Sequence, residues 1–446
     1  MKKKIITSII LILVITFILS SCHIEKKEEK DNTTQMTQII PIVTGSFIQP
    51  DLCRNWTVDD FKKHFAKFKE LSMDTFILQW IATTPYGKID TIYYDTKIAK
   101  EHFTEKPKVY PTMVENCLAA AQECGIKVFI GINLSNEWWS YPLEKDNWLE
   151  KQTDISKLIA TELFDLYKQK YPQAFYGWYW AWEMSNGMNS NELKYAQMLN
   201  LDLKTFNGLD KTMPLLMSPF NTFNSSAEKA YEEWSKFFSA TNFRKGDIFC
   251  CQDAVGAAWI TIDKLDDYYA AIKKAVDEKG GLQFWANSEN FVSDFTPSTL
   301  DRFYDQLQIA KKYCEKIISF SFCHYYFNEN KPQGFINGYK EYFKTLKKDI
   351  TPPKECNIEY TKTDQLSGNL KLIFEDPEVF KVVIRYNKTE VYNITVSAKI
   401  YESAVKGEKY ILNIPVSYQE TDFAHNFEID IVDFWNNKNT IKYTAE

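Results

Sequence analysis

Several signatures of common enzyme and binding-protein classes are absent from this 446-residue sequence. Its cysteines and five histidines form no CxxC pair and no cluster with zinc-ligand spacing, so no metal site is expected. No glycine-rich phosphate turn follows the first expected strand, and no GxSxG elbow is present. The net charge is -6 and no long basic stretch occurs beyond the extreme N-terminus, which argues against a nucleic-acid partner.

Aromatic residues, by contrast, are abundant. They make up 15% of the chain, including 12 tryptophans, and such a composition suits a ligand that stacks on flat rings. The length and an apolar content of 45% allow a large core and more than one domain.

The N-terminus has the pattern of an export signal. A basic "MKKK" precedes a long apolar run, and "LSSC" then ends at Cys22. This arrangement resembles the lipobox of bacterial lipoproteins, which implies a signal peptide over residues 1–22 and acylation of Cys22. An ordinary transmembrane anchor and a cleaved signal peptide remain alternatives. The polar, charged residues 23–39 predict a disordered tether. The expected location is the outer membrane or cell surface of a Gram-negative bacterium.

The other eight cysteines lie mostly in apolar patterns, so buried free thiols are expected.

Residues 40–350 alternate short apolar runs with amphipathic helical patterns, which is typical of repeated βα units. Eight strands are expected, and this number over about 310 residues predicts an α/β fold, a (β/α)8 TIM barrel. The expected strands are 39–49, 74–82, 126–135, 175–186, 213–220, 247–256, 282–291 and 316–326. A capping box at Thr57 and Asp60 predicts the start of one helix, and Gly125 the end of another.

Residues 351–446 have a different pattern. After "KKDITPPKECN" the apolar residues alternate with polar ones and no helical periodicity appears. About 95 residues of this kind predict a small β-sandwich of immunoglobulin or fibronectin type. Such a domain would pack on the barrel, help to present glycan, or act as a spacer.

Polar and aromatic residues gather at the carboxyl ends of the expected barrel strands, where TIM-barrel active sites lie. The ring has no lysine in a Schiff-base position and no metal-ligand cluster, so no cofactor is expected. Its members are Gln49, Gln79, Trp80, Asn133, Asn136, Glu137, Trp138, Glu183, Asn221, Gln252, Asp253, Trp285, Asn287, Glu289, His324 and Tyr325.

Glu183 and Glu289 end the fourth and seventh strands and are the strongest catalytic candidates. Cleavage of a glycosidic bond needs one carboxylic acid and one carboxylate. These strands lie opposite each other in an eight-stranded barrel, so the two side chains would converge at its mouth. A carboxyl separation of about 5–5.5 Å gives retention of configuration, and about 6.5–9.5 Å gives inversion.

The fourth strand, "FYGWYWAWEMSN", carries tryptophans at every second position. If Glu183 points into the barrel, Tyr179 and Ala181 share its side because side chains alternate along a strand. Trp178, Trp180 and Trp182 then point outward against the helices.

The two glutamates resemble the acid/base and nucleophile of clan A glycoside hydrolases, which implies these roles for Glu183 and Glu289. In that clan an asparagine precedes the strand-four acid, whereas Trp182 stands here. The chain also resembles a group of uncharacterised bacterial lipoproteins that join a glycosidase-like barrel of unknown function to a C-terminal β-sandwich. "GSFIQ", "FILQW", "GWYWAWE", "CCQDAVG" and "FWANSEN" carry this likeness.

The sequence therefore predicts a lipid-anchored glycoside hydrolase that acts on an oligo- or polysaccharide with retention of configuration. A surface protein that binds glycan without cleaving it is the alternative, and a scaffold lipoprotein is a third hypothesis. The sugar, the linkage and the oligomeric state are left open.

Overall fold

The computed structural model describes residues 39–140, 143, 145, 147–188, 190–222, 225–327, 333–374, 379–395, 410–417 and 425–445. Residues from Ile39 onward form one compact unit. The predicted signal peptide, the lipid attachment site at Cys22 and all of the tether before Ile39 lie outside the described residues. Within the described ranges, no helix combines the length and the hydropathy needed to cross a bilayer.

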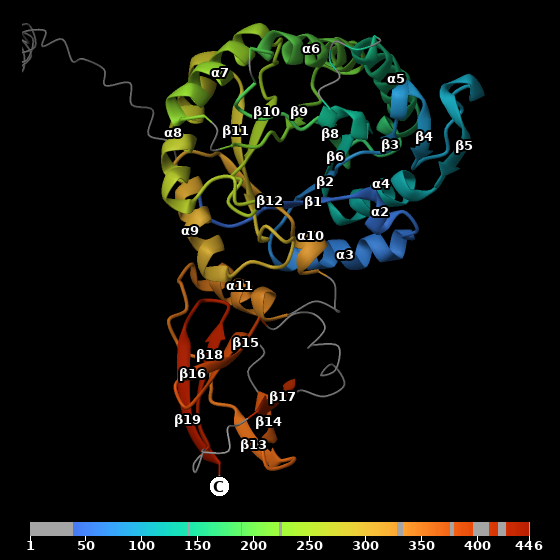
Figure 1. The fold of residues 1–446 in the computed structure, drawn as a ribbon. Coiled ribbons are helices and arrows are strands. Elements are labelled where there is room, and N and C mark those ends of the chain that lie inside the picture. Colours follow the sequence, from blue (N-terminus) through green and yellow to red (C-terminus); the bar gives the residue numbers. More distant parts are fainter. Residues whose placement is uncertain are drawn as a thin grey trace, which may run out of the picture. The chain divides into compact units, whose positions relative to one another are not determined.

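Eight parallel strands close into a barrel, which confirms the predicted fold class (Figure 1). Each strand lies within a stretch that the sequence pattern indicates. Around the barrel the order is β1-β12-β11-β10-β9-β8-β6-β2. The strands are β1 (Gly45–Ile48), β2 (Thr75–Leu78), β6 (Lys127–Gly131), β8 (Phe175–Trp180), β9 (Leu215–Met217), β10 (Ile248–Gln252), β11 (Gln283–Glu289) and β12 (Lys316–Phe320).

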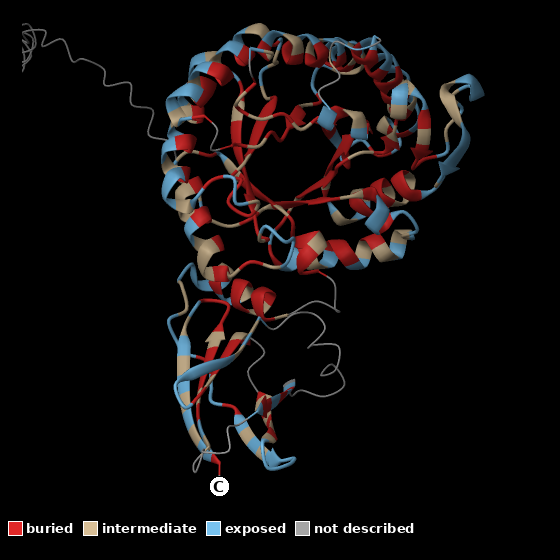
Figure 2. Cartoon of the chain, in the orientation of Figure 1, coloured by how far each residue is buried: buried red, intermediate tan, exposed pale blue. Residues whose placement is uncertain are grey.

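Helices surround the barrel and bury one face each against it (Figure 2). The capping box of Thr57 and Asp60 opens α3, and Gly125 ends α4 in the left-handed conformation, as predicted. The longer helices are α3 (Val58–Glu70), α4 (Met113–Cys124), α5 (Trp148–Leu163), α6 (Glu192–Leu209), α7 (Ala227–Ala240), α8 (Ile262–Lys279), α9 (Leu300–Ala310) and α11 (Gly334–Thr345). Two short helices, α2 (Pro50–Cys53) and α10 (Phe322–Tyr325), follow β1 and β12.

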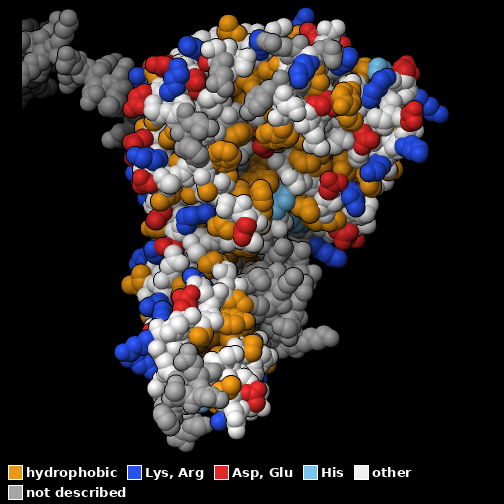
Figure 3. All heavy atoms as spheres, in the orientation of Figure 1, with side chains coloured by type: hydrophobic (Ala, Val, Ile, Leu, Met, Phe, Trp, Pro, Cys, Tyr) orange, Lys and Arg blue, Asp and Glu red, His pale blue; other side chains and the backbone are white. Residues whose placement is uncertain are grey.

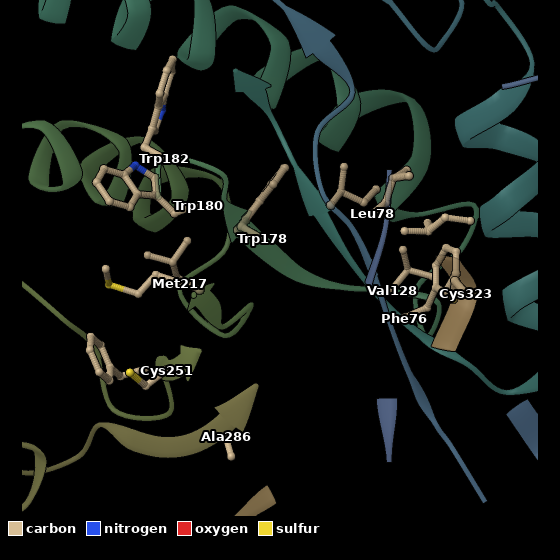
Figure 4. Close-up of a cluster of buried hydrophobic side chains, with 14 of the residues drawn as sticks. Phe76, Leu78, Val128, Trp178, Trp180, Trp182, Met217, Cys251, Ala286 and Cys323 are labelled. Carbon is tan, nitrogen blue, oxygen red and sulfur yellow. The ribbon is translucent and has the colours of Figure 1, made fainter. Parts of the chain in front are cut away.

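The alternating tryptophans point outward, as the parity argument predicts (Figure 4). The ring of Trp178 stacks on Phe206 of α6 with centroids 4.9 Å apart. The indole nitrogen of Trp180 donates a hydrogen bond of 3.0 Å to Asp202 of the same helix. Tyr179 and Ala181 instead belong to the cluster inside the barrel. The tryptophans therefore attach β8 to the helical layer.

A second sheet stands beside the barrel mouth and was not predicted from the sequence. Its order is β5-β4-β3-β7, and it is built by the segments that follow β2 and β6. Its strands are β3 (Ala82–Thr83), β4 (Ile89–Ile92), β5 (Phe103–Val109) and β7 (Asn133–Leu134). This sheet extends the wall of the barrel beyond the ends of two barrel strands.

Two antiparallel sheets form the C-terminal part of the chain and share one hydrophobic core. They agree with the predicted sandwich architecture, whereas the immunoglobulin or fibronectin type stays a prediction. One sheet contains β13 (Asn357–Lys362), β14 (Ser367–Phe374) and β17 (Tyr410–Ser417). The other contains β16 (Thr389–Thr395), β15 (Val379–Tyr386), β18 (His425–Asp433) and β19 (Lys438–Ala445).

Replacing Trp178 by alanine should destabilise the barrel strongly. The side chain is completely buried, and removing a buried tryptophan costs about 3–5 kcal/mol because a cavity remains. Trp139→Ala is the control, since Trp139 is 54% exposed and a change there should stay within about 0.5 kcal/mol. Denaturant titration followed by circular dichroism measures both variants. Equal losses of stability would contradict the packing role of Trp178.

Candidate active site

A cavity of about 500 Å³ opens at the carboxyl end of the barrel strands. Hydrophobic side chains gather around the middle of this face of the barrel (Figure 3). The cavity is lined by Phe47, Gln49, Gln79, Trp80, Leu134, Asn136, Trp139, Tyr179, Ala181, Glu183, Phe220, Gln252, Ala257, Trp259, Asn287, Glu289, Phe291, Phe295 and Phe320. Two carboxylates and several amides thus face a mainly aromatic wall, and no lysine or arginine is among the described lining residues.

Glu183 follows the end of β8 by three residues and projects into the cavity beside Tyr179 and Ala181. Burial raises the pKa of its carboxyl group to about 7, although a hydrogen bond from the Gln252 amide lowers the pKa somewhat. The indole nitrogen of Trp138 donates a 2.6 Å hydrogen bond to the carbonyl oxygen of Glu183. The glutamate is therefore fixed through its backbone, while its carboxyl group is suited to hold a proton near neutral pH.

Glu289 is the last residue of β11 and is almost completely buried. Its Oε2 atom accepts a 2.8 Å hydrogen bond from the backbone N–H of Ala257. A Cβ atom at Gly256 would lie 2.7 Å from the Glu289 Cβ and 2.9 Å from Oε2, so only glycine leaves room for the carboxylate. Burial, and then the charge of Asp253, raise the pKa of Glu289 above its ordinary value.

Asp253 lies behind Glu289 and does not line the cavity. Its carboxylate accepts hydrogen bonds from the backbone N–H groups of Val255 and Glu289, at 3.1 and 3.3 Å. The amide nitrogen of Gln306 adds a 2.5 Å bond, and the same nitrogen donates to the carbonyl oxygen of Glu289. The Arg302 guanidinium also donates to that carbonyl oxygen at 3.1 Å. This network holds the end of β11 in place.

The charge of Glu183 also raises the pKa of Glu289, although by less than burial and the charge of Asp253 do. Two negative charges in one buried cavity are unfavourable, so such a pair loses its protons in separate steps.

Two buried amide oxygens of the cavity have no hydrogen-bond partner among the described residues. They are Gln79 Oε1 and Asn287 Oδ1, and their side chains are 5% and 1% exposed. Buried polar atoms usually have partners.

The cavity brings together six of the residues proposed from sequence for catalysis or substrate binding, namely Gln49, Gln79, Trp80, Glu183, Asn287 and Glu289. Asn136 and Gln252, which belong to the same ring of strand ends, line it as well. Asn221 does not line the cavity, since its amide donates to Cys251 Sγ and to the carbonyl oxygen of Gln252.

Other proposed substrate-binding residues lie away from the cavity wall. Asn133 donates to Thr84 and Gln152 in a buried cluster. Trp138 packs against Trp148 and the outward-facing Trp182. Both side chains project from β7 or the turn after it toward the outer side of the barrel. They therefore pack behind the residues that line the cavity.

Three more residues lie away from the positions predicted for them, namely Trp285, His324 and Tyr325. Trp285 shares the inner face of β11 with Glu289 but lies four residues deeper, beneath the cavity, where it contacts Phe129. The strand β12 ends at Phe320, so His324 and Tyr325 lie on α10 instead of at a strand end. The His324 ring stacks on Phe320 with centroids 4.8 Å apart, and burial lowers its pKa to about 4.

Glu137 lines a neighbouring pocket instead of this cavity. Its carboxylate accepts hydrogen bonds from the Tyr86 backbone N–H at 3.0 Å and from the Trp148 indole nitrogen at 2.7 Å.

Sequence reasoning missed the aromatic residues that loops bring to the cavity, notably Trp259 and Phe295. These side chains are 41% and 68% exposed, and exposed aromatic rings are a mark of binding surfaces. Their positions shortly after the sixth and seventh strands were the available signal. Among the described residues no group of histidine, cysteine and acidic side chains is arranged to hold a metal ion. The eight described cysteines are free thiols, as expected.

The raised pKa of Glu183 predicts a pH-dependent contribution to stability. The folded protein binds this proton more tightly than the unfolded chain, whose glutamates titrate near 4.5. The contribution is therefore complete below pH 4.5 and is lost as the pH rises through 7, with a limit of roughly 3 kcal/mol. Glu183→Gln should consequently gain thermal stability relative to the wild type between pH 4.5 and 8, whereas exposed Glu232→Gln should not. A pH-independent difference in Tm would contradict the raised pKa.

Comparisons with known proteins agree with this architecture. The model of the family described as "Domain of unknown function (DUF4434)" matches residues 43–335. No protein with a curated description matches the sequence significantly. A solved structure described as a candidate α-L-fucosidase from Bacteroides thetaiotaomicron is similar, with 23% identity and a TM-score of 0.56 over 68% of this chain and 95% of that chain. An endo-β-1,4-mannanase from Thermotoga petrophila has 10% identity and a TM-score of 0.45 over 92% and 98% of the two chains.

The likeness to the first of these structures shows a shared barrel fold. The family model covers more than half of the chain, and we conclude that this protein belongs to the DUF4434 family.

Proposed function

We propose that this protein is a glycoside hydrolase that cleaves its substrate with retention of configuration. The observation that carries the proposal is the pair Glu183 and Glu289, two buried carboxyl groups on β8 and β11 that face one cavity and have raised pKa values. Glycosidases use such a pair, one member protonated and the other ionised. The aromatic wall and the unpaired amide oxygens suit a sugar, which offers apolar faces and hydroxyl groups.

The reacting sugar is a neutral one. Two carboxylates line the cavity, and no described lining residue carries a positive charge. An acidic sugar would place a third negative charge in this buried space without a counter-ion, which is costly. Substrates with a uronic acid or sulfate at the cleavage point are therefore disfavoured.

In the proposed reaction Glu183 is the general acid and Glu289 the nucleophile. Glu183 gives its proton to the glycosidic oxygen while a Glu289 oxygen bonds to the anomeric carbon, and the protonated leaving group departs. Water then attacks the same carbon, Glu183 takes a proton from it, and the Glu289 carboxylate is released. No step requires a cofactor.

The surroundings of the two carboxyl groups differ. The Ala257 N–H donates to Glu289, and the Arg302 guanidinium lies close enough to lower its pKa. Both favour the anion, whereas Asp253 opposes it. Glu183 receives only the Gln252 amide and has no cation beside it. Burial and Asp253 together still raise the pKa of Glu289 to about 8, above that of Glu183. The acid role of Glu183 therefore rests on its place after β8, where the resemblance to clan A puts the acid.

The residue before Glu183 differs from the clan A pattern, and the structure gives the consequence. Trp182 points outward and packs against Trp138 and Trp148. It cannot contact a ligand in the cavity, so contacts to the sugar hydroxyls fall to cavity amides such as Asn287. The same difference keeps a non-catalytic glycan-binding protein as the second candidate function.

We also propose that acylation of Cys22 anchors the protein at the cell surface, which rests on the lipobox-like "LSSC". The protein would then bind its polysaccharide substrate outside the cytoplasm.

Glu183→Gln and Glu289→Gln should each lower kcat by about 10²–10⁴-fold on the glycan that a hydrolysis screen identifies. Glycan affinity should persist, because the shape of the cavity is kept. Glu232→Gln, on the outer surface of α7, is the matched control. Azide should restore turnover of an activated aryl glycoside in the truncated variants, giving a glycosyl azide of retained configuration with Glu183→Ala and of inverted configuration with Glu289→Ala. Wild-type protein that binds glycans but releases sugar from none of them would refute the hydrolase proposal and favour the binding protein.

Asp253→Asn should move the pH profile of kcat/KM toward lower pH. The Asp253 charge raises the pKa of Glu289, so without it Glu289 ionises at lower pH. The rise of kcat/KM on the acid side of the profile should therefore occur at lower pH. The isosteric amide can still accept the Glu289 backbone N–H. A fall in activity with an unchanged profile would mean that Asp253 acts only through packing.

A further inference from the structure

A second pocket of about 430 Å³ adjoins the catalytic cavity. Trp80, Leu134 and Asn136 belong to the walls of both. The two spaces therefore meet along one boundary at the barrel mouth.

The small sheet beside the barrel builds one part of this second pocket. Thr83 of β3, Thr91 of β4 and Lys108 of β5 line one side. Asp51 and Arg54, in and directly after α2, line another part of the wall. The eight barrel strands close without this sheet, so the sheet is an addition to the barrel that supplies one side of the second pocket.

Two polar groups in the wall of this pocket lack partners and are themselves covered by neighbouring atoms. Ser135 is 3% exposed, and its Oγ atom has no hydrogen-bond partner among the described residues. The indole nitrogen of Trp80, at the boundary of the two pockets, also lacks one. A buried hydroxyl and a buried indole N–H usually find partners. A small shift of these two side chains would expose both groups to a ligand with several hydroxyl groups.

The remainder of the wall is fixed in advance. The Tyr93 hydroxyl donates to Asp51 at 2.8 Å, and the Tyr93 ring stacks on Tyr110 with centroids 5.2 Å apart. Glu137 is tied to the Tyr86 backbone and the Trp148 indole. A wall that is already ordered loses little entropy when a ligand binds.

We propose that the second pocket is a sugar subsite that continues the catalytic cavity, so that the substrate is an oligosaccharide of at least two residues. One sugar occupies the cavity at Glu183 and Glu289, and its neighbour in the chain occupies the pocket of Thr83 and Ser135. Trp80 stands between them. This inference rests on the proposed function for the cleavage step, but the binding step does not depend on it.

The test fills the second pocket by Thr83→Trp. Thr83 is half-buried and lines that pocket but not the catalytic cavity. For an oligosaccharide, kcat/KM should fall at least about tenfold, the loss of roughly 1.4 kcal/mol of binding energy. For the glycosyl fluoride of the reacting sugar, whose leaving group fills neither subsite, kcat/KM should stay within about twofold.

Thr205→Trp is the matched control, since Thr205 is also half-buried but lines a surface pocket between α5 and α6. Ser135→Ala is a milder variant that removes only the unpaired hydroxyl and should weaken oligosaccharide hydrolysis several-fold. Thermal unfolding verifies that each variant is folded.

Equal effects of Thr83→Trp on both substrates, or no effect on either, would overturn the subsite. Calorimetry of Glu183→Gln with oligosaccharide and monosaccharide separates this result from failure of the hydrolase proposal. The longer ligand should bind more tightly, and Thr83→Trp should abolish that gain. If Thr83→Trp abolishes the tighter binding of the oligosaccharide but the wild-type protein cleaves no glycan, the subsite is upheld and the hydrolase proposal is rejected. Equal affinity for both ligands would reject the subsite.

Discussion

The burial of carboxyl groups at the mouth of the barrel is the constraint on which the rest of the site depends. An ionised carboxylate is costly to remove from water unless donors or cations accompany it. Here one cation, Arg302, and a set of fixed N–H donors face Asp253 and Glu289 from behind the strand. Glu183 has little such support, and its pKa rises to about 7. The Asp253 charge nevertheless raises the pKa of Glu289 to about 8. The assignment of acid and nucleophile in the proposed mechanism therefore rests on the positions of the two residues after β8 and at the end of β11.

The position of Glu183 depends in turn on packing outside the barrel. Trp178 and Trp180 hold β8 against α6 by ring stacking and by the hydrogen bond to Asp202. Trp138 then fixes the carbonyl oxygen of Glu183 itself. These tryptophans do not line the cavity, yet they determine the direction in which the carboxyl group points. An aromatic-rich sequence therefore serves two purposes here, a rigid outer layer and an aromatic ligand wall supplied by loops.

The barrel was predictable because each parallel strand is a short apolar run between helical patterns, and because the alternation along β8 assigns Glu183 to the inside. The alternation of side chains along a strand tells which ones point into the barrel, but not how far below the mouth they lie. Trp285 was therefore predicted at the mouth but lies beneath it. Nor does parity show where a strand stops, and His324 lies on α10 for that reason. The sheet of β3, β4, β5 and β7 escaped prediction because two of its strands have only two residues each and depend on pairing between distant segments.

Trapping of the covalent intermediate tests the central claim most directly. A 2-deoxy-2-fluoro glycosyl fluoride of the reacting sugar serves as the probe. Its C2 fluorine slows both formation and hydrolysis of the glycosyl-enzyme, while its good leaving group restores formation, so the intermediate accumulates and peptide mapping by mass spectrometry can locate the attached sugar. One glycosyl group per protein is expected, in an ester with the carboxyl group of Glu289. Attachment to Glu183, or rapid hydrolysis of the natural glycan through an inverted product without any adduct, would contradict it.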